Sequence, residues 1–124
     1  MFEDQVALKP QAVAVQSPQG DWTYAQLGEQ VARMSAWLRV QGVARGDRVA
    51  ILSKNRLESL LLYFAASKTG VVPVPLNYRL APPEWAYILQ DAQAKMLIVA
   101  KEYLPAITGI RGELTRLEHR ITLT

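Results

Sequence analysis

The sequence has no cysteine and a single histidine among its 124 residues. Without thiols the chain forms neither a disulfide nor a thiolate metal site, which is consistent with a reducing compartment. The histidine, His119, lies in a charged stretch and has no serine or carboxylate at a spacing that would orient it for catalysis. We expect it to be solvated or to lie at a strand edge. The spaced ligand clusters typical of zinc and calcium sites are also missing.

Long apolar runs and clustered positive charge are also lacking. No run approaches the roughly 20 apolar residues of a membrane-spanning helix, and the start of the chain, Met1–Asp4, is unlike a secretory signal. The net charge of +3 comes from 14 basic and 11 acidic residues that alternate along the chain, whereas nucleic-acid-binding surfaces gather bases on one face. We therefore predict a cytoplasmic segment, residues 1–124, with no transmembrane helix and no affinity for nucleic acid.

The apolar residues are arranged in a way that predicts the fold class. They make up 50% of the chain, which is enough for a core of its own. Short β-branched runs alternate with longer segments of helical period, a pattern typical of an α/β fold with a mostly parallel sheet flanked by helices. The expected strands are Ala12–Ser17, Arg48–Ser53, Val71–Pro75 and Met96–Ala100, with a fifth that begins near Ile121.

The first two helices have recognisable ends. Thr23 followed three residues later by Gln26 predicts a capping box, and Gly42 is expected to end that helix. The second helix is predicted from Asn55 to Gly70. Its apolar residues spread round most of its circumference, so it needs burial on more than one side.

Two further helices are expected in the second half of the chain. Pro82 and Pro83 suit the first turn of one of them, and the other is predicted from Pro105 to about Leu117. Aromatic residues within the helical patterns are expected to pack in the core and not to form a cofactor cage; these are Trp22, Trp37, Tyr63, Trp85 and Tyr87.

The segment Gly42–Arg48 contains two glycines and two arginines. A phosphate-binding loop needs its glycines after a strand and at the start of a helix, where free N–H groups point at the anion. Here the expected order is helix, loop and strand. We interpret the segment as a structural turn in which Asp47 binds local backbone groups.

Arg79 is the candidate ligand-binding residue. Pro75 closes a predicted buried strand because proline cannot donate to a central ladder. The residues that follow therefore emerge at the carboxyl end of the sheet, where ligands gather in open α/β folds. An ordinary surface arginine, and an arginine that fixes the loop, are the alternatives that remain open from the residues alone.

Several blocks of the sequence, taken in order, resemble the adenylate-forming enzymes. Trp22–Leu27 resembles their Thr-Tyr-x-Glu-Leu helix start, and Gly42–Ile51 resembles their Gly-Val-x-x-Gly-Asp-x-Val-Ala block. Lys68–Asn77 and Pro83–Lys95 continue the match at similar spacing. Each block alone is weak, but the ordered set from Ala12 to Ala100 is specific. The chain resembles the N-terminal portion of the AMP-binding domain of an AMP-forming acyl-CoA synthetase.

The resemblance also implies residue roles. Pro75–Leu80 is most similar to acyl-CoA and aryl-CoA ligases, in which the arginine of this block can lie along the nucleotide end of coenzyme A. Arg79 is thus implied to contact a CoA phosphate, to which a guanidinium is well suited. No catalytic residue and no metal ligand is expected here, because the ATP-binding glycine-rich loop and the C-terminal domain with its catalytic lysine are absent. Ala81 departs from the Ser or Thr common at its position, which weakens a helix cap.

The implied parent enzyme is a ligase of fatty acid metabolism that uses ATP, Mg2+ and CoA. It would convert a carboxylic acid to acyl-CoA, AMP and pyrophosphate, with the remainder of the synthetase as the partner of this segment. The chain alone is expected to hold no cofactor, to be catalytically silent, and to self-associate through uncovered surface. Two alternatives stay open: a stand-alone, non-enzymatic module that binds an acyl group or a partner protein, and part of an enzyme that loads a carrier protein.

Overall fold

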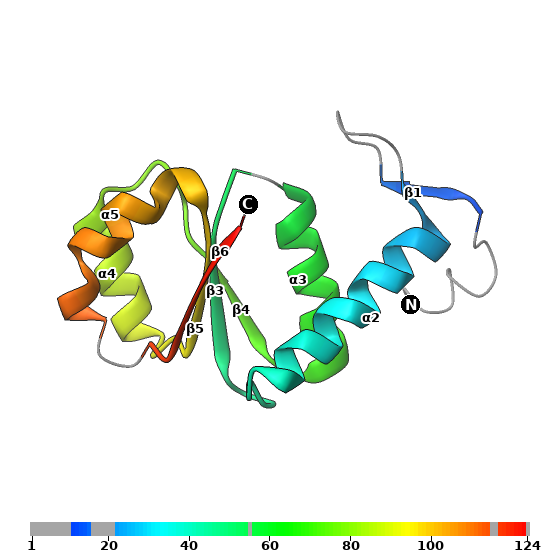
Figure 1. Cartoon of the computed structure of the whole chain (residues 1–124), viewed down its shortest axis with the longest axis horizontal. Coiled ribbons are helices and arrows are strands. Elements are labelled where there is room, and N and C mark those ends of the chain that lie inside the picture. Colours follow the sequence, from blue (N-terminus) through cyan, green and yellow to red (C-terminus); the bar gives the residue numbers. More distant parts are fainter. Residues whose placement is uncertain (1–10, 16–21, 55, 115–116, 124) are drawn as a thin grey trace.

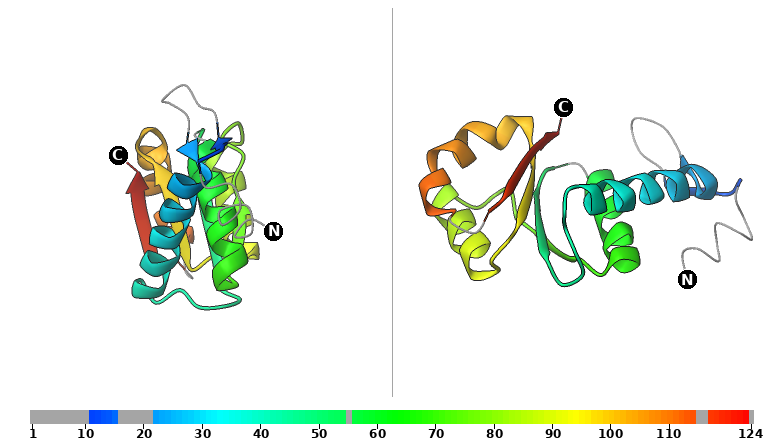
Figure 2. Two further views of the ribbon diagram at one scale, coloured as in Figure 1. Left: turned by 90° about the vertical axis from the view of Figure 1, so that its right-hand side faces the viewer. Right: turned by 60° about the horizontal axis from the view of Figure 1, so that its bottom comes forward.

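A computed structural model describes residues 11–15, 22–54, 56–114 and 117–123. A four-stranded parallel sheet, in the order β4-β3-β5-β6, lies between two layers of helices (Figure 1). Helices α2 (Tyr24–Val40) and α3 (Arg56–Thr69) cover one face, and α4 (Pro82–Asp91) and α5 (Leu104–Gly109) cover the other (Figure 2). The predicted α/β class is confirmed. The strands are β3 (Arg48–Leu52), β4 (Val72–Pro75), β5 (Met96–Ala100) and β6 (His119–Leu123).

The two central strands divide their side chains between two cores. Successive side chains of a strand point to opposite faces of the sheet, and every residue from Val49 to Leu52 and from Met96 to Val99 is buried. Burial on both faces is typical of central parallel strands. One core combines Val49, Ile51, Met96 and Ile98 with Leu38 and Leu62, and the other combines Ala50, Leu52, Leu97 and Val99 with Trp85, Leu89 and Ile107.

The first predicted strand does not belong to the main sheet. Of Ala12–Ser17, the structure assigns Val13–Val15 to β1, while Ser17 lies outside the described residues. β1 pairs antiparallel with β2 (Trp22–Thr23) in a separate two-stranded sheet beside the start of α2 (Figure 1). The backbone N–H of Tyr24 donates to the carbonyl of Ala12 at 2.9 Å, which fixes this pair to the helix. β2 was not predicted because two residues are too few to show an alternating pattern.

The expected helix starts are confirmed where the structure describes them. The Thr23 hydroxyl accepts from the backbone N–H of Gln26 at 3.2 Å, and the Gln26 side chain accepts from the backbone N–H of Thr23 at 2.9 Å. α2 ends at Val40, and Gly42 follows with φ of +81°. Asn55 lies outside the described residues. α3 contacts both β4 and α2, so the prediction that it needs burial on more than one side is confirmed.

The helix predicted from Pro105 to Leu117 is wrong in its extent. α5 ends at Gly109, and a 3-10 turn, η2 (Arg111–Glu113), follows it. Glycine is the weakest helix former after proline, and this segment contains Gly109 and Gly112. The buried side chains of Ile107 and Ile110 then hold the segment against the sheet.

Two aromatic residues, Tyr63 and Tyr87, were also wrongly expected to pack. Tyr63 is 42% exposed. Tyr87 is 70% exposed. Tyr87 lies two positions from both Trp85 and Leu89, the two large buried side chains of α4. Residues two apart do not share a helix face, so Tyr87 points away from the core.

The two edges of the sheet differ in their capacity to bind another strand. The backbone N–H of Val72 donates to the carbonyl of Asp47 at 2.8 Å, and that of Leu76 donates to Ile51 at 2.9 Å. Because backbone groups alternate along a strand, Pro73 and Pro75 turn their nitrogens outward, where they offer no donor. The β4 edge is therefore closed. β6 forms the opposite edge, and no further strand pairs with it in the part of the chain that the structure describes.

Candidate functional site

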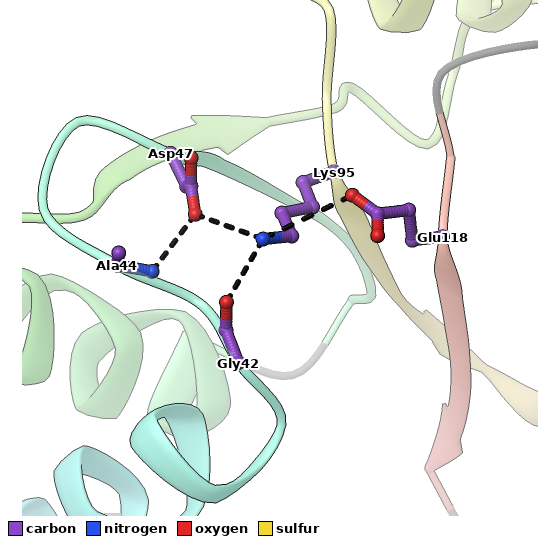
Figure 3. A network of polar contacts seen from close by, with 5 residues as sticks. All are labelled: Gly42, Ala44, Asp47, Lys95 and Glu118. Carbon is purple, nitrogen blue, oxygen red and sulfur yellow. Dashed lines mark hydrogen bonds and ion pairs between the residues drawn. The ribbon is translucent and has the colours of Figure 1, made fainter.

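The glycine-containing segment before β3 is a structural turn, as predicted. The Asp47 carboxylate accepts from the backbone N–H of Ala44 at 2.8 Å (Figure 3). The backbone N–H of Asp47 donates to the Ala44 carbonyl at 3.0 Å. The hydrogen bond from Ala44 holds the pKa of Asp47 below its ordinary value, and the contact with Lys95 adds to this shift against the opposing effect of burial. The Asp47 carboxylate is therefore engaged in hydrogen bonds that hold the turn.

Lys95, which directly precedes β5, links this turn to the starts of β5 and β6 at the amino end of the sheet. Its ammonium donates to the carbonyl of Gly42 at 2.8 Å and to the Asp47 carboxylate at 3.3 Å (Figure 3). Glu118, just before β6, lies 3.9 Å from the same nitrogen. Each charged group of this cluster has a partner of opposite charge within the chain, so we assign the cluster a structural role. His119, the next residue, begins the edge strand β6, in agreement with the strand-edge interpretation of that residue.

The opposite, carboxyl edge of the sheet holds Arg79. Three parallel neighbours, β3, β4 and β5, end there, so residues that follow different strands come together. Lys54 follows β3, and Tyr78 and Arg79 follow β4. Lys54 Nζ lies 5.3 Å from the centroid of the Tyr78 ring, and Arg79 Cζ lies 5.4 Å from the same centroid. Both distances are within the range of a cation–π interaction.

The loop that carries Arg79 is held by its own hydrogen bonds. The Asn77 side chain accepts from the backbone N–H of Arg79 at 3.0 Å. The carbonyl of Asn77 accepts from the indole N–H of Trp85 at 2.9 Å and from the backbone N–H of Leu80 at 3.1 Å. Because Trp85 is buried in α4, these bonds tie the loop to the core.

The aromatic ring of Tyr103 packs against the same loop. Tyr103, at the end of η1 (Lys101–Tyr103), lies 6.5 Å from Tyr78 and 5.9 Å from Trp85 between ring centroids. The Trp85–Tyr103 pair is T-shaped, a favourable arrangement for aromatic rings. The Tyr103 hydroxyl is buried and has no hydrogen-bond partner within the described residues. Tyr78 is thereby placed with one ring neighbour and two cations.

Lys54 and Tyr103 were not singled out from the sequence. Both follow predicted strands, Arg48–Ser53 and Met96–Ala100, at the same end as Arg79. Their positions could have indicated that they lie near Arg79, because the carboxyl ends of parallel strands share one edge of the sheet. A lysine or tyrosine after a strand is too common to identify without the strand order.

The described ranges offer no metal site and no membrane-spanning helix. They contain no group of three histidine, aspartate or glutamate side chains that could hold a metal ion. Among their helices, none is both long enough and apolar enough to cross a membrane. The described cation–aromatic group at the carboxyl edge therefore remains the site to interpret.

The chain is similar to a well-defined group of enzymes. Residues 2–124 match the family model described as AMP-binding enzyme. The chain is 37% identical over 115 residues to a long-chain-fatty-acid–CoA ligase of Mycobacterium tuberculosis, FadD13, covering 91% of this chain and 23% of that protein. It is 41% identical over 101 residues to a long-chain-fatty-acid–CoA ligase of Thermus thermophilus, covering 82% of this chain and 19% of the relative.

A solved structure shows the same architecture. The anthranilate CoA ligase AuaEII, in complex with anthranoyl-AMP, superposes with a TM-score of 0.93 and 33% identity, covering 98% of this chain and 24% of that one. This chain belongs to the AMP-binding enzyme family. It spans about a quarter or less of the length of these relatives.

Proposed function

We propose that this chain is the N-terminal part of the AMP-binding domain of an AMP-forming acyl-CoA synthetase. The observation that carries the proposal is that its relatives are CoA ligases and match nearly the whole of this chain. Their names include ligases of long-chain fatty acids and of anthranilate. Because these are aliphatic and aromatic, the proposed substrate is a carboxylic acid of either kind. The reaction is adenylation by ATP with Mg2+, followed by transfer of the acyl group to the thiol of CoA.

Within this enzyme we propose that Arg79 binds a phosphate at the nucleotide end of CoA. Its guanidinium is exposed and has no carboxylate partner in the described part of the chain. Its backbone is held by Asn77, and its side chain lies against Tyr78. A guanidinium in such a setting can bind phosphate oxygens through two parallel hydrogen bonds.

The test compares the two half-reactions of the full-length synthetase. Arg79→Ala should raise the KM for CoA about tenfold, because an exposed charge-assisted contact contributes roughly 1.5–3 kcal/mol at best. Pyrophosphate exchange, which reports adenylation alone, should stay close to wild type. Equal loss in both half-reactions would assign Arg79 to the fold and reject the CoA contact.

The 124-residue chain by itself is proposed to contribute scaffold and this contact, but no catalytic group. Pyrophosphate exchange with ATP and a panel of fatty and aromatic acids should therefore give no turnover. Activity that follows the purified chain through further purification would contradict the proposal, as would turnover that disappears only when this chain is denatured. The adenylation machinery would then have to lie within residues 1–124.

A further inference from the structure

We propose that Lys54 is a second phosphate-binding residue, which acts with Arg79 on the nucleotide end of CoA. This inference rests on the proposed function, since it assigns another residue to the same site. Lys54 belongs to the loop after β3, and Arg79 to the loop after β4. The two loops are 25 residues apart in sequence but adjacent in space because β3 and β4 pair in parallel.

The two cations contact the same aromatic ring, that of Tyr78. Both approach the same ring, at 5.3 Å for Lys54 Nζ and 5.4 Å for Arg79 Cζ. Their separation therefore cannot exceed the sum of these two distances. Groups within that span can contact neighbouring phosphates of one oligophosphate, or opposite sides of a single phosphate.

The two cations also lack the carboxylate partners that Lys95 and Arg33 have. Lys95 is paired with Asp47 and Glu118, and Arg33 is paired with Glu29. Within the described residues, neither Lys54 nor Arg79 forms an ion pair with a carboxylate. Two uncompensated positive charges near each other raise the local potential and attract an anion.

Contact with a ring leaves the donors of both cations available. The ring face attracts the charge and does not accept a conventional hydrogen bond from each N–H group. An arginine has five N–H donors and a lysine has three, and here no acceptor is assigned to either side chain in the described ranges. Tyr78 thus restrains both cations near one point while their donors remain free for phosphate oxygens, which reduces the ordering cost of binding.

The loop that carries Tyr78 and Arg79 is held in place by hydrogen bonds and ring packing. Asn77 holds the backbone of Arg79, and Trp85 holds Asn77. Tyr103 packs beside both aromatic rings. A multiply charged anion such as the phosphorylated ADP end of CoA satisfies two fixed cations better than a single carboxylate does.

Kinetics of the full-length synthetase test the inference. Lys54→Gln should raise the KM for CoA by about three- to tenfold, since an exposed charge-assisted contact is lost. Lys54→Arg should keep the KM within about twofold because it retains the charge. The control is Lys68→Gln, which removes an exposed lysine from the last turn of α3, whereas Lys54 lies before the first turn of that helix. This substitution should leave the KM for CoA unchanged. Pyrophosphate exchange and the thermal unfolding midpoint should match wild type in all three variants.

The remaining outcomes separate this inference from the function on which it rests. If Arg79→Ala raises the KM for CoA and Lys54→Gln does not, Lys54 is no phosphate ligand and the proposed function stands. If neither variant affects CoA, the CoA site itself is misplaced. An effect of Lys54→Gln on the KM for ATP instead of CoA, or an equal loss in both half-reactions, would also overturn the inference.

Discussion

At the scale of single residues, Asp47 shows how one side chain holds a turn. It accepts a hydrogen bond from Ala44 and contacts Lys95, which comes from the segment before β5. Both interactions favour the ionised carboxylate, and the pKa of Asp47 is lowered for that reason. A group with a lowered pKa in the folded state stabilises the protein above its unfolded pKa and loses that contribution as the pH falls through the folded value.

We therefore predict a pH-dependent effect of Asp47→Asn. At pH 7 the substitution should lower the free energy of unfolding by about 1 kcal/mol, because the charged partner of Lys95 is lost while an acceptor for Ala44 remains. The difference from wild type should shrink below about pH 4, where the carboxyl of wild type is progressively protonated. Urea unfolding at several pH values measures it, with Glu113→Gln, an exposed acid, as the control. A difference that stays constant down to pH 3 would show that the charge is unimportant.

The Tyr103 hydroxyl leads to a second prediction at the residue scale. It is buried without a hydrogen-bond partner in the described chain, and an unsatisfied buried polar group costs about 1–3 kcal/mol. Tyr103→Phe should therefore raise the free energy of unfolding by about 1 kcal/mol, since the ring contact with Trp85 remains. Tyr63→Phe, which removes a hydroxyl from an exposed side chain, should leave it unchanged. A loss of stability in Tyr103→Phe would reveal a partner for the hydroxyl.

At the scale of elements, α2 begins with a complete N-terminal cap, whereas the cap of α4 is incomplete. Thr23 and Gln26 form both hydrogen bonds of a capping box at α2. Ala81, at the start of α4, has no side-chain acceptor, and only the Glu84 carboxylate reaches back to the Ala81 N–H, at 3.4 Å. The next two residues, Pro82 and Pro83, have no N–H group. The first helix donor is therefore the N–H of Glu84, which donates to the Ala81 carbonyl at 2.9 Å and could also be bound by a side-chain cap.

A matched pair of substitutions tests this difference. Ala81→Ser should stabilise the protein by about 0.5–1 kcal/mol, because the backbone at Ala81 is already extended as a cap requires. Thr23→Ala should destabilise it by about 1 kcal/mol. Urea midpoints of both variants, compared with wild type at equal m-value, give the result. No gain from Ala81→Ser would mean that the prolines alone set the start of α4.

At the scale of the whole molecule, the sheet has one closed edge and one open edge. Pro73 and Pro75 remove the outward donors of β4, whereas β6 has a free side in the described structure. An unpaired strand edge is a template for another strand. Association through α3 is less favoured than the sequence suggested, because α3 packs against α2 and β4 and buries Leu62, Ala65 and Ala66 in the core.

We accordingly predict that the 124-residue chain self-associates through β6. Light scattering over a concentration series should show a mass that rises above the monomer, since edge pairing depends on concentration. Amide exchange in β6 should slow as concentration rises, and exchange in β4 should not. A monomer at every concentration would show that the open edge is insufficient for association.

Local features of this protein were determined by its sequence alone. The capping box at Thr23, the Asp47 turn and the position of Arg79 after a strand depend on residues close together in the chain, whose periods of 2 and 3.6 identify strands and helices. Only the tertiary structure decided that β1 and β2 lie apart from the main sheet and that α5 is short. It also decided that Lys54 and Arg79 share Tyr78, and that Lys95 reaches Asp47. These contacts join distant segments and depend on strand order, which hydrophobic packing of the whole chain sets and no local pattern encodes.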